Sequence, residues 1–422
     1  GEAAEAQRRE FSAFQRQYLL VYVLVMLADW LQGTHMYTLY SSYSTSNESI
    51  SVGTLFFTGF LAAGVLGTFT GPLVDKYGRK RACLVYVLLE VVINLLEHLN
   101  HMSALMVGRV LGGVSTSLLF SAFEAWMVTE HRRRRFPEEW ISSTFGLCAV
   151  CNGATAVVAG FMAQVAADWF GDIGPFELAI CLTAAAGAGM LTWRENFGAA
   201  NTAARAGESD TAQGLGSAWR AVRASESLSV LGSVYALFEG AMYIFVFNWV
   251  PSVARALGGF GALAPVQGLL FACLMAAIAI GGELYSLAAR AWRVEAIGVG
   301  VFAAAAACMA VTAYCEAMPC GSPFAVRFAA FLGFEVAVGA FQPCIATHRS
   351  KYVPDAMQST VNNLFRLPLN LLVALGTMLS DWFPPEVVFG ICACAHLLAV
   401  LCQSRLALRT RGVAGAVKAR TD

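Results

Sequence analysis

Charged residues are scarce in this chain of 422 residues. Asp, Glu, Lys and Arg make up 13% of it, whereas hydrophobic residues make up 57% and the mean hydropathy is +0.60. Soluble domains usually carry about 25% charged residues, so this composition indicates a protein of the lipid bilayer. Because about 20 apolar residues span a membrane as a helix, we searched for stretches of that length with a helical period. Twelve are found, at about 18–40, 51–74, 81–97, 103–130, 140–167, 173–194, 227–252, 261–289, 294–314, 322–347, 356–380 and 386–404.

Motifs of the common catalytic classes are also missing. The sequence has no nucleotide-binding loop, no cluster of metal ligands at a familiar spacing and no nucleophile elbow. We therefore expect neither ATP-driven pumping by this chain nor an enzyme active site. No cofactor, metal or nucleic-acid partner is expected either.

The basic residues are placed unevenly, although the 28 Lys and Arg residues balance the 28 Asp and Glu residues. If the N-terminus is cytoplasmic, most basic residues fall in cytoplasmic segments, and Arg255 alone falls in an outer loop. The positive-inside rule then predicts that both ends are cytoplasmic and that the number of spans is even. We expect a cytoplasmic segment at 1–17, six-helix bundles at 18–194 and 227–404, a cytoplasmic linker at 195–226 and a cytoplasmic tail at 405–422.

Acidic residues inside the apolar stretches recur at nearly one offset. Asp29 and Glu239 lie 210 residues apart, and Glu124 and Glu335 lie 211 residues apart. An ionisable group in hydrocarbon costs a few kcal/mol, so such groups indicate function or an internal partner. Longer matches at similar offsets are Phe120-x-x-Phe123-Glu124 with Phe331-x-x-Phe334-Glu335, Ser143-Thr144 with Ser359-Thr360, and Asp168-Trp169-Phe170 with Asp381-Trp382-Phe383. The pattern predicts an all-α membrane protein of twelve transmembrane helices, arranged as two pseudo-symmetric six-helix bundles like those of secondary transporters.

The turn between the second and third stretches carries a candidate gating motif, formed by Gly71, Asp75, Gly78, Arg79 and Lys80. Glycine permits a tight turn, and Asp75 can accept a hydrogen bond from Arg79 or from a helix N-terminus. The motif resembles the signature of the major facilitator superfamily, Gly-x-x-x-Asp-x-x-Gly-Arg-Lys/Arg. That resemblance implies a latch that joins the two bundles on the cytoplasmic side in one alternating state. The alternative is an ordinary basic loop.

The fourth stretch begins with a second motif, Gly108-Arg109-Val-Leu-Gly112-Gly113. It resembles a superfamily motif whose arginine projects toward the central cavity. An arginine keeps its charge in a protein and needs anionic company. For Arg109 the candidates are Asp29, Glu124 or a substrate anion, and a permanent internal ion pair remains an equal alternative to transport.

Longer strings carry a closer resemblance, which extends from about residue 11 to about residue 405. They include Ala28-Asp29-Trp30-Leu31-Gln32, Leu119-Phe-Ser-Ala-Phe-Glu-Ala-Trp126, Tyr243-Ile-Phe-Val-Phe247, Arg349-Ser-Lys-Tyr-Val-Pro354 and Asn363-x-Phe365-Arg366-x-Pro368-Leu369. Together they resemble the molybdate-anion transporter branch of the major facilitator superfamily. The resemblance implies uptake of molybdate, a tetrahedral dianion.

Such an anion needs converging arginines, amides, hydroxyls or helix N-termini. The primary candidate is Arg366, which stands next to Pro368 in the eleventh stretch, where a bend in the helix is expected. The alternative for Arg366 is a structural ion pair with Glu335 or Glu239. The further candidate ligands are Arg109, Asn362, Asn363 and Gln32.

The acidic residues oppose an anion unless they are protonated or already paired. Burial disfavours the charged carboxylate, so proton coupling through Asp29, Glu124, Glu239 and Glu335 would resolve the conflict. Internal Arg–carboxylate pairs without a role in coupling are the alternative. A carrier of an organic solute such as a sugar or peptide and a non-transporting ligand sensor remain alternative functions. We expect the protein to reside in the plasma membrane, or in an organelle membrane, and to contact its lipids. The sequence leaves the oligomeric state open and is compatible with a monomer.

Overall fold

The computed structural model describes residues 2–197, 219–318, 323–353 and 358–421. Almost all of these residues are helical, and none of them is in a strand. The first half contains α1 Glu2–Ser46, α2 Val52–Tyr77, α3 Arg79–Leu96, α4 Met102–Leu119, α5 Ala122–Arg133, α6 Glu139–Phe170 and α7 Gly174–Met190. The second contains α10 Glu226–Leu257, α11 Phe260–Leu263, the short 3-10 turn η1 Ala264–Val266, α12 Gln267–Ala288, α13 Val294–Ala317, α14 Phe324–Tyr352, α15 Gln358–Trp382 and α16 Pro385–Thr421.

Each of the twelve predicted stretches falls on one helix or on a pair of consecutive helices. Within the described ranges, nine helices or joined helix pairs are long and apolar enough to cross a membrane, and a bent α2 makes ten. The other two are α3, which begins with three basic residues, and α7, which is a shorter apolar helix. The predicted all-helical membrane fold is therefore confirmed.

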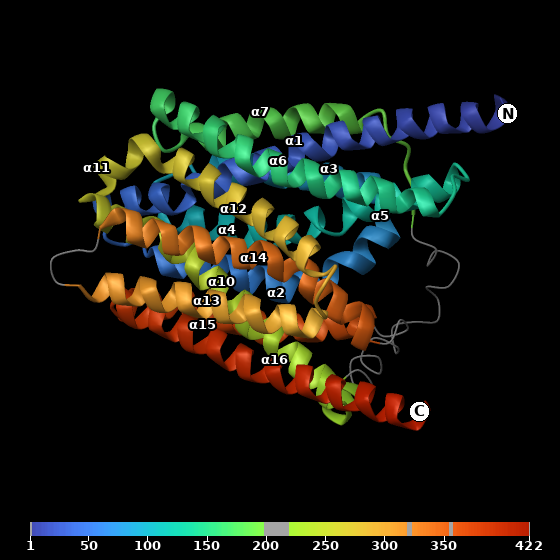
Figure 1. Cartoon of the computed structure of the whole chain (residues 1–422). Helices are drawn as coiled ribbons and strands as arrows, with labels where there is room; N and C mark the ends of the chain where they lie inside the picture. Colours follow the sequence, from blue (N-terminus) through green and yellow to red (C-terminus); the bar gives the residue numbers. More distant parts are fainter. Residues whose placement is uncertain (1, 198–218, 319–322, 354–357, 422) are drawn as a thin grey trace. The chain divides into compact units, whose positions relative to one another are not determined.

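The contacts divide the chain into two compact units. The first unit is Gly1–Gly207 with Pro265–Ala272, and the second unit is Glu208–Ala264 with Cys273–Asp422. Most of the predicted linker at 195–226 lies outside the described residues. The short segment at the start of α12 thus packs with the first unit although it follows the linker. In Figure 1, α1 (blue) and α7 (green) run side by side in the first unit, and α13 and α16 do so in the second.

Small residues bring helix backbones together in both units. A Cβ added at Gly113 of α4 would lie 2.5 Å from the backbone nitrogen of Ala63 in α2. A Cβ at Gly339 of α14 would lie 1.9 Å from the carbonyl oxygen of Ile278 in α12. Lipid offers little hydrophobic drive for helix association, so this close van der Waals packing holds the bundles together and fixes where their polar side chains meet.

Candidate functional site

Three carboxyl groups gather in the core of the first unit. Glu90 of α3 accepts a hydrogen bond from Gln32 Nε2 at 2.9 Å and another from the hydroxyl of Ser115. Asp29 of α1 interacts electrostatically with Glu90, and Glu97 at the end of α3 does so as well. Glu90 is 7% exposed and Glu97 is 0% exposed, so these charges are shielded from solvent. Sequence analysis placed Asp29 and Gln32 here, and the structure adds Glu90 and Glu97.

Arg109 of α4 lies at the edge of this group of acids. Its guanidinium interacts electrostatically with the hydroxyl of Tyr40, and that hydroxyl donates to Glu97 Oε1 at 2.7 Å. It also lies over the ring of Phe56 at 5.4 Å, and Nη1 is 2.9 Å from Met36 Sδ. No carboxylate among the described residues lies within 4.0 Å of Arg109, so neither Asp29 nor Glu124 forms an ion pair with it.

Glu124 occupies a different environment from the three buried acids. It lies in the first turn of α5, where its side chain is exposed. Its electrostatic neighbours include Tyr18, Tyr22 and Cys148. The structure therefore separates Glu124 from Arg109, although both lie on the fourth predicted span.

The predicted gating motif forms a sharp junction between α2 and α3. Gly78 has φ 108°, a left-handed conformation that suits glycine, and it separates the two helices. Arg79 donates to Asp75 Oδ1 from Nη2 at 2.7 Å and from Nε at 3.0 Å, as the sequence suggested. Arg79 also donates to the carbonyl oxygen of Ala125 at 3.0 Å and to the hydroxyl of Thr129. The motif thus ties α2 and α3 to α5 inside the first unit, and Gly71 lies one turn before Asp75 on α2.

The N-terminus of α3 is capped by a residue that the motif does not contain. The carboxylate of Glu195 accepts from the backbone nitrogens of Lys80 at 2.8 Å and Arg81 at 3.1 Å, where the helix dipole favours a negative charge. The ammonium of Lys80 donates to the carbonyl oxygens of Leu191 at 2.9 Å and Trp193 at 2.7 Å. Glu195 stands in the predicted linker, which is why sequence reasoning gave it no role.

Glu239 is the centre of a second polar cluster, in the core of the second unit. It lies in α10, is 8% exposed and interacts with Tyr235, one turn earlier, and with Gln342 of α14. Two cations, Arg349 of α14 and Arg366 of α15, interact with it electrostatically. Arg349 also lies over the ring of Tyr235, 5.7 Å from its centre. One buried carboxylate therefore faces two guanidinium groups, and we call these five residues the Glu239 cluster.

Close packing of α10 and α15 places Arg366 near Glu239. A Cβ at Gly232 would lie 2.5 Å from Phe365 Cε1, and a Cβ at Gly376 would lie 2.2 Å from Ile244 Cδ1. The side chain of Arg366 is exposed, and Pro368 lies inside the helix as predicted. Asn362 and Asn363 lie on the same helix, but their side chains are outside the described part of the chain.

Sequence reasoning missed three members of the Glu239 cluster: Arg349, Tyr235 and Gln342. Gln342 and Arg349 are seven residues apart on α14, so they share one helix face. That spacing could have indicated from the sequence that Gln342 and Arg349 lie near each other. It was overlooked because the tenth predicted stretch ends at 347, before Arg349, whereas α14 continues to Tyr352.

Glu335 lies apart from the Glu239 cluster. It is in the middle of α14 and is 4% exposed, with no hydrogen bond or ion pair to any residue whose side chain the structure describes. The structure therefore gives no support to the alternative in which Arg366 is the ion-pair partner of Glu335.

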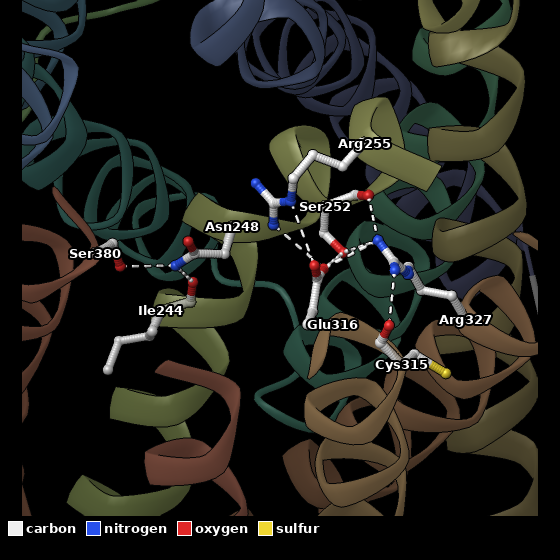
Figure 2. A network of polar contacts seen from close by, with 8 residues as sticks. All are labelled: Ile244, Asn248, Ser252, Arg255, Cys315, Glu316, Arg327 and Ser380. Atoms are coloured by element: carbon white, nitrogen blue, oxygen red, sulfur yellow. Dashed lines mark hydrogen bonds and ion pairs between the residues drawn. The ribbon is translucent and has the colours of Figure 1, made fainter. Parts of the chain in front are cut away.

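A third polar network joins the ends of three helices in the second unit (Figure 2). Glu316 of α13 is paired with Arg327 of α14 at 3.1 Å and with Arg255 of α10 at 3.2 Å. Ser252 donates its hydroxyl to Glu316, and Arg327 donates to the carbonyl oxygens of Ser252 at 2.7 Å and Cys315 at 3.2 Å. Arg255 Nε also donates to the second carboxylate oxygen, Oε2, at 3.3 Å. Both oxygens of Glu316 are thus occupied by donors from the protein, an arrangement that fits a structural clamp better than a ligand site.

Outside the spans, two acids show how their surroundings change proton affinity. The guanidinium of Arg132 next to Glu138 holds the pKa of that carboxyl below its usual value. Burial raises the pKa of Asp172, in the turn between α6 and α7. Neither group belongs to the two buried clusters.

Comparisons with known proteins place this geometry in a family. A family model described as sugar transporters with 12 TM matches residues 1–337. A molybdate-anion transporter of Xenopus laevis is 34% identical over 414 residues, which cover 93% of this chain and 85% of the relative. A molybdate-anion transporter of Danio rerio is 34% identical over 390 residues, covering 87% of this chain and 79% of the relative.

Solved structures share the fold at low sequence identity. A mutant of the nucleoside transporter NupG has a TM-score of 0.73 at 12% identity, with 92% of this chain and 99% of that chain covered. A D-xylose-proton symporter has a TM-score of 0.71 at 12% identity, with 92% and 96% covered. The relatives and these neighbours are transporters rather than enzymes. The chain is an integral, multi-pass membrane protein and belongs to the molybdate-anion transporter family of the major facilitator superfamily.

Proposed function

We propose that this protein is a secondary active transporter of molybdate, or of a similar tetrahedral oxyanion, and works by alternating access. The observation that carries the proposal is the convergence of Arg349 and Arg366 on Glu239 in the core of the second unit. The names of the relatives support molybdate as the cargo.

The Glu239 cluster has the chemistry that a tetrahedral dianion requires. Guanidinium groups bind oxyanions through paired N–H donors, and phenol or amide groups add neutral donors. Arg349, Arg366, Tyr235 and Gln342 supply these groups from three helices. Arg366 is exposed although it lies within a membrane span, which is expected of a residue that lines a water-filled cavity. Asn362 and Asn363 are further ligands that we propose in the second unit, and Arg109 and Gln32 are the ligands that we propose in the first unit.

Glu239 then acts as the internal counter-ion of the empty site. In its charged form it balances one of the two arginines, and protonation removes that balance, so that both guanidinium groups become available to the anion. This arrangement would couple anion entry to proton entry. The other carboxyl groups that we propose for coupling are Asp29, Glu124 and Glu335.

The topology of the proposal follows from the distribution of basic residues. Both termini face the cytoplasm, with bundles at 18–194 and 227–404 joined by a linker at 195–226, while 1–17 and 405–422 form the cytoplasmic ends. The protein resides in the plasma membrane among its lipids and functions as a monomer.

The junction of α2 and α3 is the gate in this proposal. Asp75 and Arg79 are held together and bound to α5, while Gly78 allows the sharp turn and Lys80 is bound to the end of α7. This junction would move as one rigid piece with the first unit, which is what a latch on the cytoplasmic side requires. A Cβ at Gly71 would meet open space among the described residues, so close packing does not require a glycine there.

A sugar or another organic solute is the second candidate cargo. The description of the matching family model, sugar transporters, favours it, and so does the number of buried acids in the first unit. A neutral solute has no need of two arginines opposite one carboxylate, which is why we rank it second. Competition experiments discriminate between the two cargos.

The experiment is uptake of radioactive molybdate by liposomes that contain the purified protein. We expect saturable uptake that molybdate and tungstate inhibit, that sulfate inhibits less and that D-xylose does not affect. Acidifying the outside should increase the rate if a proton is carried with the anion. Liposomes without protein are the control. Uptake of a sugar in place of molybdate would replace the proposal with its alternative, and saturable binding without uptake would point to a sensor.

A further inference from the structure

Arg109 is a membrane arginine whose guanidinium group is only partly satisfied by hydrogen bonds. Its Nε atom is buried and has no hydrogen-bond partner among the described residues, and no described carboxylate lies within ion-pair distance. Its link to Glu97 is the hydroxyl of Tyr40, which interacts electrostatically with Arg109 and donates to Glu97 Oε1 at 2.7 Å. Tyr40 is 0% exposed. The hydroxyl therefore connects a cation and an anion that do not touch each other.

Glu97 is poorly stabilised as an anion in this position. It is 0% exposed, and its Oε2 atom has no hydrogen-bond donor. The charged groups around it are Arg109 of α4 and, on its own helix, Glu90 and His98. From α7, Glu177 faces His98 at 3.4 Å, and α1 contributes the neutral hydroxyls of Tyr40 and Tyr43. A buried carboxylate with one free oxygen readily takes up a proton.

We propose that Glu97 is a proton-binding site that controls, through Tyr40, whether Arg109 is available to an oxyanion. With Glu97 ionised, its charge balances Arg109 across the shared hydroxyl, and a second anion near Arg109 is disfavoured. With Glu97 protonated, the guanidinium loses the charge of the acid that Tyr40 links to it, and an oxyanion takes that role. Proton and anion therefore bind cooperatively, and by linkage each raises the affinity for the other by the same factor. The inference rests on the proposed function and deepens it by naming the proton site.

The test measures the dissociation constant for molybdate against pH, with the full-length protein in nanodiscs. In the wild type the affinity should fall as pH rises, by up to about tenfold per pH unit for one coupled proton. Glu97→Gln mimics the protonated acid, so its affinity should stay high and lose most of this dependence. Tyr40→Phe should also flatten the profile, because the link between Glu97 and Arg109 is broken.

Tyr43→Phe is the matched control. Tyr43 donates to the main-chain oxygen of Glu97 at 2.8 Å and does not touch the carboxylate. The same chemical change is made one turn away, so a general loosening of α1 against α3 would affect both phenylalanine variants. We expect the Tyr43 variant to keep the wild-type pH dependence. A wild-type slope in both Glu97→Gln and Tyr40→Phe would overturn the switch.

The outcomes also separate the switch from the proposed function. If the wild type binds molybdate but Glu97→Gln retains the pH dependence, the transporter assignment stands and the switch is wrong. If the wild type binds neither molybdate, tungstate nor sulfate, both are wrong. Proton uptake upon addition of molybdate, followed with a pH indicator in weak buffer, gives a second readout. It should be smaller in Glu97→Gln than in Tyr43→Phe.

Discussion

The buried polar clusters of the two units have opposite charge balances. In the first unit, Arg109 interacts electrostatically with Glu90 and Glu97, and Glu90 also interacts with Asp29. In the second unit, Glu239 alone faces two arginines. Acids in excess suit the storage of protons, and arginines in excess suit the capture of an anion. A sequence repeat can therefore keep the position of an acid while the residues around it assign that acid a different task.

Asp29 and Glu239 illustrate the divergence. They occupy matching positions of the repeat, in α1 and α10. The charged neighbour of Asp29 is another acid, Glu90, whereas the charged neighbours of Glu239 are Arg349 and Arg366. Substitution of Arg349 or Arg366 should therefore weaken molybdate binding in a way that substitutions in the first cluster do not.

The largest effect is expected from the arginines of the second cluster. Arg366→Ala and Arg349→Ala should each weaken molybdate binding by about 100-fold, or about 2.7 kcal/mol, since each removes a charged guanidinium donor to the anion. Radioactive uptake and equilibrium binding measure the loss. Arg366→Lys should restore part of the affinity, because the charge returns without the planar fork.

Arg290→Ala is the control for this comparison, since Arg290 is exposed and lies beyond the end of α12. It should leave uptake unchanged. Normal affinity in Arg366→Ala would remove Arg366 from the site. Normal affinity in both Arg366→Ala and Arg349→Ala would mean that the different charge balance of the two clusters plays no role in molybdate binding.

Substitutions in the network of Figure 2 should change stability strongly and leave the affinity for molybdate unchanged. Arg327→Ala should lower the free energy of unfolding by about 3–5 kcal/mol, because Glu316 would keep its buried charge and lose its buried partner. Thermal unfolding in detergent measures this change. Arg255 shares the same carboxylate but is 45% exposed, so Arg255→Ala should cost no more than about 1 kcal/mol.

Arg255 and Arg327 can therefore be compared with Arg349 and Arg366 of the Glu239 cluster, since all four are arginines near an acid but only the latter two are proposed to bind molybdate. The proteins that remain folded should keep the wild-type affinity for molybdate in both variants. Equal stability of Arg327→Ala and the wild type would mean that the network does not hold α10, α13 and α14 together.

The sequence predicted the helices well because apolar length and period are local properties. It also predicted that Asp75 and Arg79 would meet, since they lie one turn apart at a glycine junction. It named Glu239 and Glu335 as candidate partners of Arg366 but could not choose between them, and it did not predict Tyr40 as a partner of Arg109, because these contacts depend on which residues of other helices meet. Tyr40 is an example: nothing in its neighbours along the chain indicates that it links Arg109 to Glu97.

The repeat also predicted one environment for Glu124 and Glu335, and the structure gives them two. In the second unit α14 is continuous, so Phe331 and Phe334 are 0% exposed and Glu335 is 4% exposed. In the first unit the chain breaks between α4 and α5, at Phe120 and Ser121. Phe120 is 61% exposed, and Glu124 is exposed as well. The break between α4 and α5 therefore exposes Glu124, whereas the matching Glu335 is buried in a continuous helix. An alignment of the two sequence segments does not reveal this difference.

The smallest effect is expected from this last pair of acids, and it should differ between the two copies. Glu335→Gln keeps the shape of a buried side chain and removes a carboxyl group that has no partner among the described residues, so it should stabilise the protein by about 1 kcal/mol. Glu124→Gln should not change stability measurably, because the side chain is already exposed. Thermal unfolding of both variants under the same conditions provides the comparison. A loss of stability in Glu335→Gln would mean that its carboxyl group has a partner, and the second unit would then contain a second paired acid in addition to Glu239.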